Sequence, residues 1–327
     1  MAAGDGPSLS EMGLAEWLDT PLTMELAAPD ADPLAAAPAA AGGAEAATEK
    51  PTKGPPLPLY TVEGTGGGLI VPMAYLVNAG PGAGPTGGYT FVKIGKKTIH
   101  QASITQTILG RLELGYALVT VDLGDFPRDV QKHTGVDIGF SHIVMHNFNV
   151  RGLVVPEGTC SPYMPAITGG VTFKYTPAVQ EIDRRLGRGV RALGMERSNG
   201  TDFTLTASKT IPNVCFGRPV MVTGGLRFSQ GAQLGLLGFG DAYRLTAEGS
   251  VCVPVTDWMA IAYEYRQKKN PYRRLGSLVG EEDSWHTLCL AFILNEHCAL
   301  ACGWGDFGYM INHREEGVWG FQFKYEF

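Results

Sequence analysis

The chain has 327 residues, including 44 glycines, and a mean hydropathy of zero. That glycine content, about twice the usual share, favours a β-rich protein with many turns, and no apolar run approaches the ~18 residues of a membrane-spanning helix, which disfavours a helical membrane protein. Residues 1–58 carry a net charge of −7 and the remainder +1, so the near-neutral body lacks the basic surface that binds nucleic acid.

Residues 1–58 are predicted to form a disordered acidic tail. The stretch APDADPLAAAPAAAGGAEAATEKPTKGPPLP buries too little apolar surface to order itself. Before it, SLSEMGLAEWLD is typical of a short amphipathic helix with Ser8 and Glu11 as a capping box. No secretory signal peptide is visible, so we expect an upstream start or an export signal already removed.

Residues 59–87 contain the glycine-rich stretch GTGGGLIVP. It lacks the Lys-Ser/Thr ending of a phosphate-binding loop. The segment is therefore predicted to be an internal plug or a flexible lead-in, and the barrel domain is placed at 59–327.

From residue 88 onward, short alternating segments are separated by turn residues. They predict about twelve strands, most near the ~10 residues of a tilted membrane-spanning strand. The predicted strands are 88–94, 98–107, 112–122, 138–149, 168–176, 202–209, 220–229, 244–254, 258–267, 285–294, 298–305 and 317–327. Short and long links alternate, as in a barrel with tight turns at one rim; the link at 95–97 is shorter than this pattern and that at 150–167 longer.

Alternating side chains give each predicted strand an apolar and a polar face. In the last strand, GVWGFQFKYEF, one face is entirely aromatic, and no residues follow that could form a covering sheet. The aromatic positions are Trp319, Phe321, Phe323, Tyr325 and Phe327. Lipid would solvate this aromatic face without a covering sheet. The fold class predicted is therefore all-β, a closed antiparallel transmembrane β-barrel from Tyr89 to Phe327.

A soluble β-sandwich binding module is the alternative, because sandwiches show the same alternation with the polar face outward. Aromatic residues near strand ends favour the membrane, where they would lie at the interface with water. They are Trp258, Trp285, Trp304, Tyr325 and Phe327.

Two stretches carry a resemblance to known proteins. The terminal aromatic alternation resembles the C-terminal signal of bacterial outer-membrane barrels, which implies recognition by the barrel-assembly machinery, a periplasmic C-terminus and long loops outside the cell. The segments GTGGGLIVP, GLLGFGDAYRLTAEGSVCVPVTDWMAIAYEYRQKKNP and EEDSWHTLCLAFILNEHCALACGWGDFG are similar to an uncharacterised bacterial family of predicted outer-membrane proteins, a domain of unknown function. The resemblance spans residues 60–327 and implies an outer-membrane location, with no activity or catalytic residue to carry over.

The predicted interior is lined by charges of both signs. A mixed lining is typical either of ion pairs that fill a small barrel or of a narrow polar path for solutes. The predicted lumen-lining residues are Glu113, Lys174, Arg227, Arg244, Glu248, Glu264, Arg266, Lys324 and Glu326.

Basic residues gather in two predicted long loops. Arginine binds phosphate in a bidentate manner, so outer-membrane lipids, including lipopolysaccharide, and anionic solutes are candidate partners; a solvated loop without a specific ligand is the alternative. The predicted cationic patch comprises Arg184, Arg185, Arg188, Arg191, Arg197, Lys268, Lys269, Arg273 and Arg274.

An outer-membrane lipid-modifying enzyme is the alternative function. The nearest candidate residues are Ser141, His142 and His146, but neighbours on a strand face opposite sides, so Ser141 and His142 are not expected to pair. We therefore predict no catalytic residue, cofactor or metal site, and a passive role as a narrow pore or a structural barrel, in an oligomeric state that the sequence leaves open.

Overall fold

The structure, a computed structural model, describes residues 57–272 and 278–327. The predicted disordered tail, with its short helix, lies outside the described residues except for Leu57 and Pro58. None of the helices in the described ranges is long and apolar enough to cross a bilayer.

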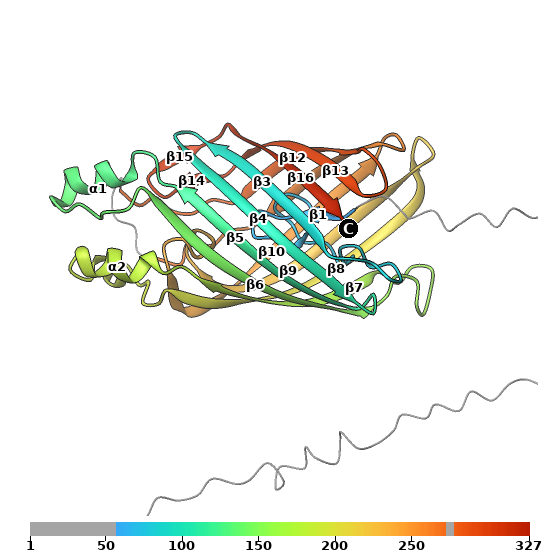
Figure 1. Cartoon of the computed structure of the whole chain (residues 1–327), viewed down its shortest axis with the longest axis horizontal. Coiled ribbons are helices and arrows are strands. Elements are labelled where there is room, and N and C mark those ends of the chain that lie inside the picture. Colours follow the sequence, from blue (N-terminus) through green and yellow to red (C-terminus); the bar gives the residue numbers. More distant parts are fainter. Residues whose placement is uncertain (1–56, 273–277) are drawn as a thin grey trace, which may run out of the picture. The chain divides into compact units, whose positions relative to one another are not determined.

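Twelve strands form one closed antiparallel barrel (Figure 1). Each pairs with its neighbour along the chain, and the last pairs with the first over Trp319–Glu326 and Thr86–Lys93, which closes the barrel. The strands are β3 (Thr86–Ile94), β4 (Lys97–Ile108), β5 (Leu112–Asp122), β6 (His142–Val155), β7 (Ala166–Tyr175), β8 (Asn199–Cys215), β9 (Arg218–Gly231), β10 (Phe239–Pro254), β11 (Met259–Arg266), β12 (Trp285–Ile293), β13 (Cys298–Asp306) and β16 (Val318–Glu326). The predicted fold class is confirmed and the sandwich is wrong.

The two ends of the barrel differ. The turn end carries the C-terminus and tight links such as Phe216–Gly217. The loop end, at the left of Figure 1, carries the helices and one small hairpin. These elements are α1 (Phe126–Thr134), α2 (Ala178–Arg185), α3 (Gly189–Ala192), the 3₁₀ turn η1 (Gln233–Gly235), β14 (Gly308–Met310) and β15 (His313–Glu315). Both predicted exceptions hold: the β3–β4 link at the loop end has two residues, and the β6–β7 link at the turn end spans 156–165.

Several predicted strand boundaries are wrong: β8 extends to Cys215 rather than 209, β10 begins at Phe239 rather than 244, and β6 is shifted toward the C-terminus at both ends. Residues 138–141 continue the loop after α1 and do not join β6, because Gly139 takes a left-handed conformation (φ 72°) in a turn where Asp137 accepts its N–H. The strand begins at His142 and runs to Val155, which brings Arg151 into it.

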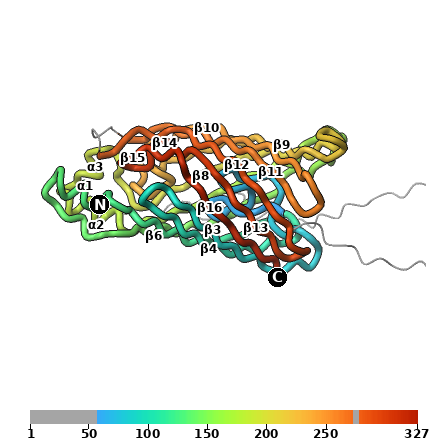
Figure 2. The backbone as a smooth tube through the Cα atoms, turned by 90° about the horizontal axis from the view of Figure 1, so that it is seen from above, coloured from blue at the N-terminus to red at the C-terminus, as the bar shows by residue number. Residues whose placement is uncertain are grey.

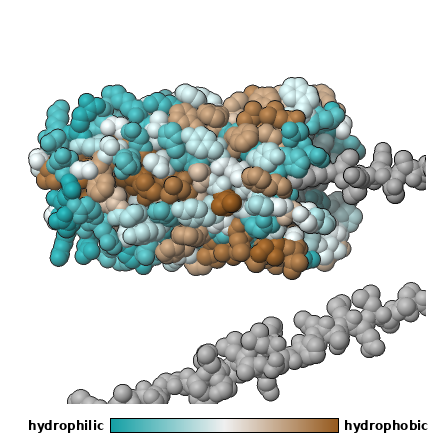
Figure 3. Space-filling model, viewed as in Figure 1, coloured by the Kyte–Doolittle hydropathy of each residue, from teal (hydrophilic) through white to brown (hydrophobic). Residues whose placement is uncertain are grey.

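Side chains alternate across the barrel wall as predicted. Along β16 every second residue is buried, and the intervening aromatic residues are exposed on the outside. Tyr263 on β11 and Leu205 on β8 are likewise about half exposed on the outer face. Hydrophobic patches lie over the strands in Figure 3, whereas the loop end is mostly hydrophilic.

Trp285 is an exception to the predicted interfacial aromatics. Its side chain is buried inside the barrel and stacks on Phe307, with ring centroids 4.1 Å apart. It shares the inward face of β12 with Thr287 and Cys289, so strand alternation, rather than the usual location of tryptophan, determines its position.

Residues 57–77, here called the inner segment, lie within the barrel and are buried almost throughout. They include the short ladder between β1 (Leu59–Tyr60) and β2 (Gly66–Gly67), drawn in blue inside the barrel in Figures 1 and 2. The chain then leaves at the turn end, where the Phe327 N–H donates to the Pro85 carbonyl at 3.0 Å.

Closure between β16 and β3 can be tested by cross-linking. Trp319 and Lys93 are direct partners across this seam, so a Trp319→Cys/Lys93→Cys pair, in a Cys302→Ser background, should form a disulfide within one chain under mild oxidation. Peptide mass spectrometry measures the link. Lys93→Cys with Phe323→Cys, four residues further along β16, is the control; equal linking of both pairs would contradict the register.

Candidate functional site in the barrel interior

Glu63 of the inner segment meets three basic side chains of the barrel wall. Its carboxylate binds Lys174 on β7 and Arg266 on β11, and lies 3.4 Å from Arg227 on β9. All four side chains are buried. One residue of the inner segment therefore joins three strands that are not neighbours in the barrel.

Two acidic wall residues complete this central ion cluster. Asp202 on β8 lies 2.6 Å from Lys174 and 3.2 Å from Arg227. Glu248 on β10 lies 3.2 Å from Arg227 and 3.9 Å from Arg266. With Glu63 present, three anions oppose three cations, the balance that buried charges require.

Three cations surround the Glu63 carboxylate and favour its ionised form. Burial alone would raise its pKa, but the charges of Arg266, Lys174 and Arg227 outweigh burial and hold the pKa well below its usual range. The cluster is therefore made of charged pairs.

Glu264 on β11 holds the backbone of the inner segment. Its carboxylate accepts the N–H groups of Leu69, Ile70 and Val71 at 2.8, 2.7 and 2.9 Å. A Cβ at Gly68 would lie 2.1 Å from the same carboxylate, so this glycine is needed for the close approach. The backbone of the glycine-rich stretch is therefore in close contact with the Glu264 carboxylate of the barrel wall.

Further contacts hold both ends of the inner segment. Arg151 on β6 pairs with Glu113 on β5 at 3.0 Å and donates to the Gly66 carbonyl at 2.8 Å. The Val77 N–H donates to Glu113 at 2.9 Å. Near the other end, Lys324 donates to the Pro58 carbonyl at 2.6 Å and pairs with Glu326 at 2.7 Å.

Eight of the nine predicted lumen-lining residues are buried inside the barrel. Arg244 is half-buried near the loop end, beside a small polar pocket that Arg227 and Lys268 also line.

Sequence reasoning missed Glu63, Arg151 and Asp202. The inward alternation of Asp202 with Thr206 and Ser208 on β8 was a usable signal. Arg151 was missed because the predicted strand ended at 149. No local pattern marks Glu63, since its partners lie on three distant strands.

The predicted cationic patch is largely neutralised by acidic side chains. Among the described residues the pairs are Arg184 and Arg185 with Glu181, Arg191 with Asp183, and Arg197 with Asp241. Within those residues Arg188 has no acidic partner in ion-pairing range; Arg184, Arg188 and Arg191 line an open groove of about 520 Å³.

The second half of the patch is divided. Lys268 is almost fully buried and pairs with Glu282 at 2.6 Å, whereas Lys269 is exposed. Arg273 and Arg274 lie outside the described residues.

Ser141 and His142 do approach each other, contrary to prediction. Ser141 Oγ lies 3.3 Å from His142 Nδ1, because Ser141 belongs to the loop before β6 and not to the strand. In the described part of the chain no acidic residue forms an ion pair with His142, and His146 instead contacts the Tyr116 hydroxyl at 2.8 Å. The described residues 57–272 and 278–327 also contain no cluster of three or more His, Cys, Asp or Glu suited to a metal.

A closed barrel of twelve antiparallel strands with an apolar outer face and a charged interior has the architecture of a membrane-spanning β-barrel protein. Residues 58–322 match the family described as "protein of unknown function (DUF3034)", and the chain belongs to that family. No curated protein matches it.

Several solved structures are similar. The NanC porin is 8% identical, with a TM-score of 0.43 over 75% of this chain and 99% of the other. The COG4313 outer membrane channel from Pseudomonas putida F1 is 9% identical, with a TM-score of 0.43 over 79% and 100% of the chains. Omp33 from Acinetobacter baumannii is 7% identical, with a TM-score of 0.38 over 75% and 98%.

Removing the Glu63 charge should destabilise the protein. Glu63→Gln leaves three buried cations facing two anions, so we expect a loss of about 3–5 kcal/mol in the free energy of unfolding, the usual cost of breaking a buried pair. Denaturant titration of the purified protein in detergent measures it. Glu296→Gln, at a side chain that is 60% exposed, should change little; equal stability of Glu63→Gln and the unaltered protein would contradict the importance of the cluster.

Proposed function

We propose that this protein is a bacterial outer-membrane barrel whose narrow, passive pore is closed by the inner segment as a plug. The observation that carries the proposal is the contact of Glu63 with Lys174, Arg227 and Arg266, which puts a charge of the inner segment against the charged wall inside the lumen. Movement of the inner segment would uncover a wall lined by both signs of charge.

The outer surface supports a membrane location. Its exposed strand positions are mostly aromatic or aliphatic, such as Phe228, Tyr263 and Phe321, which water solvates poorly and lipid solvates well. We infer an orientation with the turn end in the periplasm and the loop end outside the cell.

Part of the contact between the plug and the wall is polar. Hydrogen bonds and ion pairs of the inner segment could be replaced by water on displacement, whereas apolar side chains such as Leu69 and Ile70 pack in the hydrophobic core. The wall also has polar groups without a protein partner, at Gln101 and Ser103 on β4. A permanently filled structural barrel is the competing interpretation, and conductance separates the two.

The proposed partners are outer-membrane lipids around the strands and the barrel-assembly machinery at β16. Lipopolysaccharide phosphate is a candidate at the groove beside α2 and α3. There, Arg188 has no acidic partner among the described residues.

Planar-bilayer recording tests the pore. The unaltered protein should conduct little, and a variant lacking residues 1–77 should show larger, stable single-channel currents, because the polar lumen is then open. In that variant, Arg266→Glu should shift ion preference toward cations, whereas Arg218→Glu, at an exposed pair with Asp257, should not. Silence of the shortened, correctly folded barrel would contradict the pore.

The role of the last strand is tested separately. Phe323→Ser with Phe327→Ser removes two exposed aromatic side chains, so we expect reduced membrane assembly with unchanged synthesis, because lipid-facing surface and the proposed recognition signal are lost together. Heat-modifiable migration of the membrane fraction measures assembly. Lys269→Ser, in an exposed loop, is the control; normal assembly of the double variant would contradict this role.

A further inference from the structure

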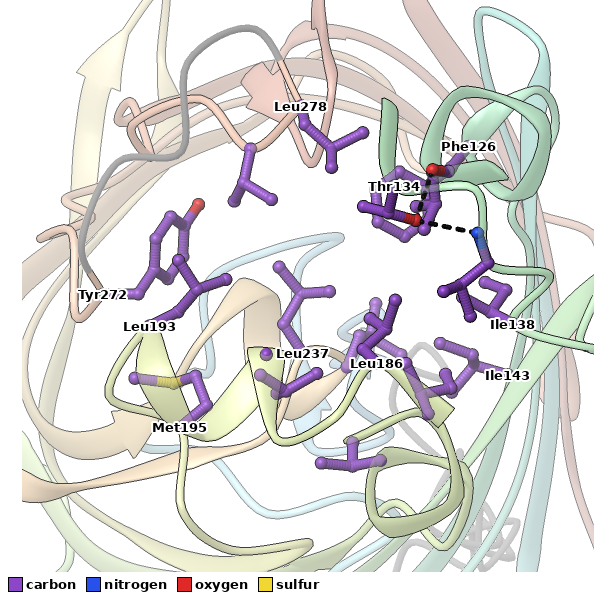
Figure 4. Close-up of a pocket in the computed structure, with 18 residues that line it drawn as sticks. Phe126, Thr134, Ile138, Ile143, Leu186, Leu193, Met195, Leu237, Tyr272 and Leu278 are labelled. Atoms are coloured by element: carbon purple, nitrogen blue, oxygen red, sulfur yellow. Dashed lines mark hydrogen bonds between the residues drawn. The ribbon is translucent and has the colours of Figure 1, made fainter. Parts of the chain in front are cut away.

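A partly open apolar cavity lies at the loop end. Its volume is about 270 Å³, and among the described residues no charged side chain lines it. Four separate parts of the chain contribute side chains: α1 with the residues after it, the α2–α3 hairpin, the loop after η1, and Tyr272, Leu278 and Val279 between β11 and β12. In Figure 4, Phe126 and Ile138 lie across this cavity from Tyr272 and Leu193.

The size of the cavity distinguishes it from ordinary packing. Protein interiors seldom contain voids much larger than a water molecule, and an apolar cavity of about 150 Å³ already binds benzene. Several wall residues, including Leu186, Val190 and Leu193, are only half-buried. An apolar ligand would complete their burial.

The polar groups of the wall are satisfied within the protein. Thr134 Oγ1 donates to the Val130 carbonyl at 2.8 Å and accepts the Val136 N–H at 3.2 Å. The Tyr272 hydroxyl donates to the Gly280 carbonyl at 2.8 Å and accepts from Gln233 at 3.2 Å. A charged ligand would lose its hydration without gaining a partner here.

The cavity is separate from the charged lumen. Leu236 and Leu237, which follow η1 directly, line the cavity. The η1 turn itself is hydrogen-bonded to residues of the barrel wall, since Lys174 donates to the Leu234 carbonyl at 3.1 Å and Thr176 to the Gly235 carbonyl at 2.9 Å. A ligand in the cavity is thus recognised independently of conduction through the lumen.

We propose that this cavity is a binding site for a small uncharged hydrocarbon-like molecule, aromatic or alicyclic, held at the loop end of the barrel. Shape and apolar contact would select the ligand, since the described wall residues carry no charge and their two polar side chains, Thr134 and Tyr272, already have partners within the protein.

Photolabelling of the full chain in lipid nanodiscs tests the site, with adamantane diazirine as the probe. Saturable insertion into peptides of α1 and of the α2–α3 hairpin is expected, mapped by mass spectrometry. Excess naphthalene should reduce this labelling by roughly tenfold or more, whereas naphthoate should not, because its carboxylate must be desolvated to enter. Equal competition by both, or labelling confined to outward strand positions, would overturn the proposal.

Filled cavities provide a second measurement. Val190→Trp and Val279→Trp occupy the space from two different wall segments and should each remove the saturable labelling, while Leu205→Trp on the outer face should retain it. Heat-modifiable migration checks that each variant is folded. Unchanged labelling in both folded filling variants would overturn the site, and if neither folds, the two competitors on the unaltered protein decide the matter.

Discussion

The interior of this barrel depends on a balance of buried charge. The walls place Lys174, Arg227 and Arg266 around one point but supply only Asp202 and Glu248 as their wall partners in the cluster. The third anion, Glu63, comes from the inner segment. An unpaired charge in such surroundings is costly, so the position of the inner segment and the composition of the wall are linked.

The same dependence holds for the backbone. Much of the inner segment is irregular, and its N–H and C=O groups need partners inside the lumen. Glu264 accepts three N–H groups, and Gln322 both accepts the Tyr60 N–H at 2.8 Å and donates to the Tyr60 carbonyl at 2.6 Å. The polar face of the wall therefore replaces water for a chain without extensive secondary structure.

Along its axis the protein combines two opposite environments. The lumen is charged and hydrogen-bonded, and the cavity at the loop end is apolar, with η1 between them. The short helices α1 and α2 turn Val130 and Ile182 toward this cavity. Polar solutes and apolar ligands would thus meet different parts of the same molecule.

Local sequence determined the barrel and the faces of its strands, because alternation has a period of two and can be read within one strand. Glu264 was assigned to the interior on that basis, and the structure places it there with its neighbour Tyr263 on the outer face. Trp285 follows the same rule. Its alternation with His286 and Leu288 indicates an inward side chain, and the prediction that it lies at the membrane interface was wrong because it was based on residue type.

The sequence suggested 59–87 as an internal plug or a flexible lead-in, but only the tertiary structure decided which contacts hold the inner segment in the barrel. Glu63 meets side chains 111 and 203 residues away, and no local pattern encodes such pairs. The Ser141–His142 contact arises from where a loop passes into a strand, and the apolar cavity from four segments that the sequence keeps apart. Strand alternation is a property of neighbours along the chain, whereas these arrangements exist only because closure of the barrel brings distant strands and loops around common points.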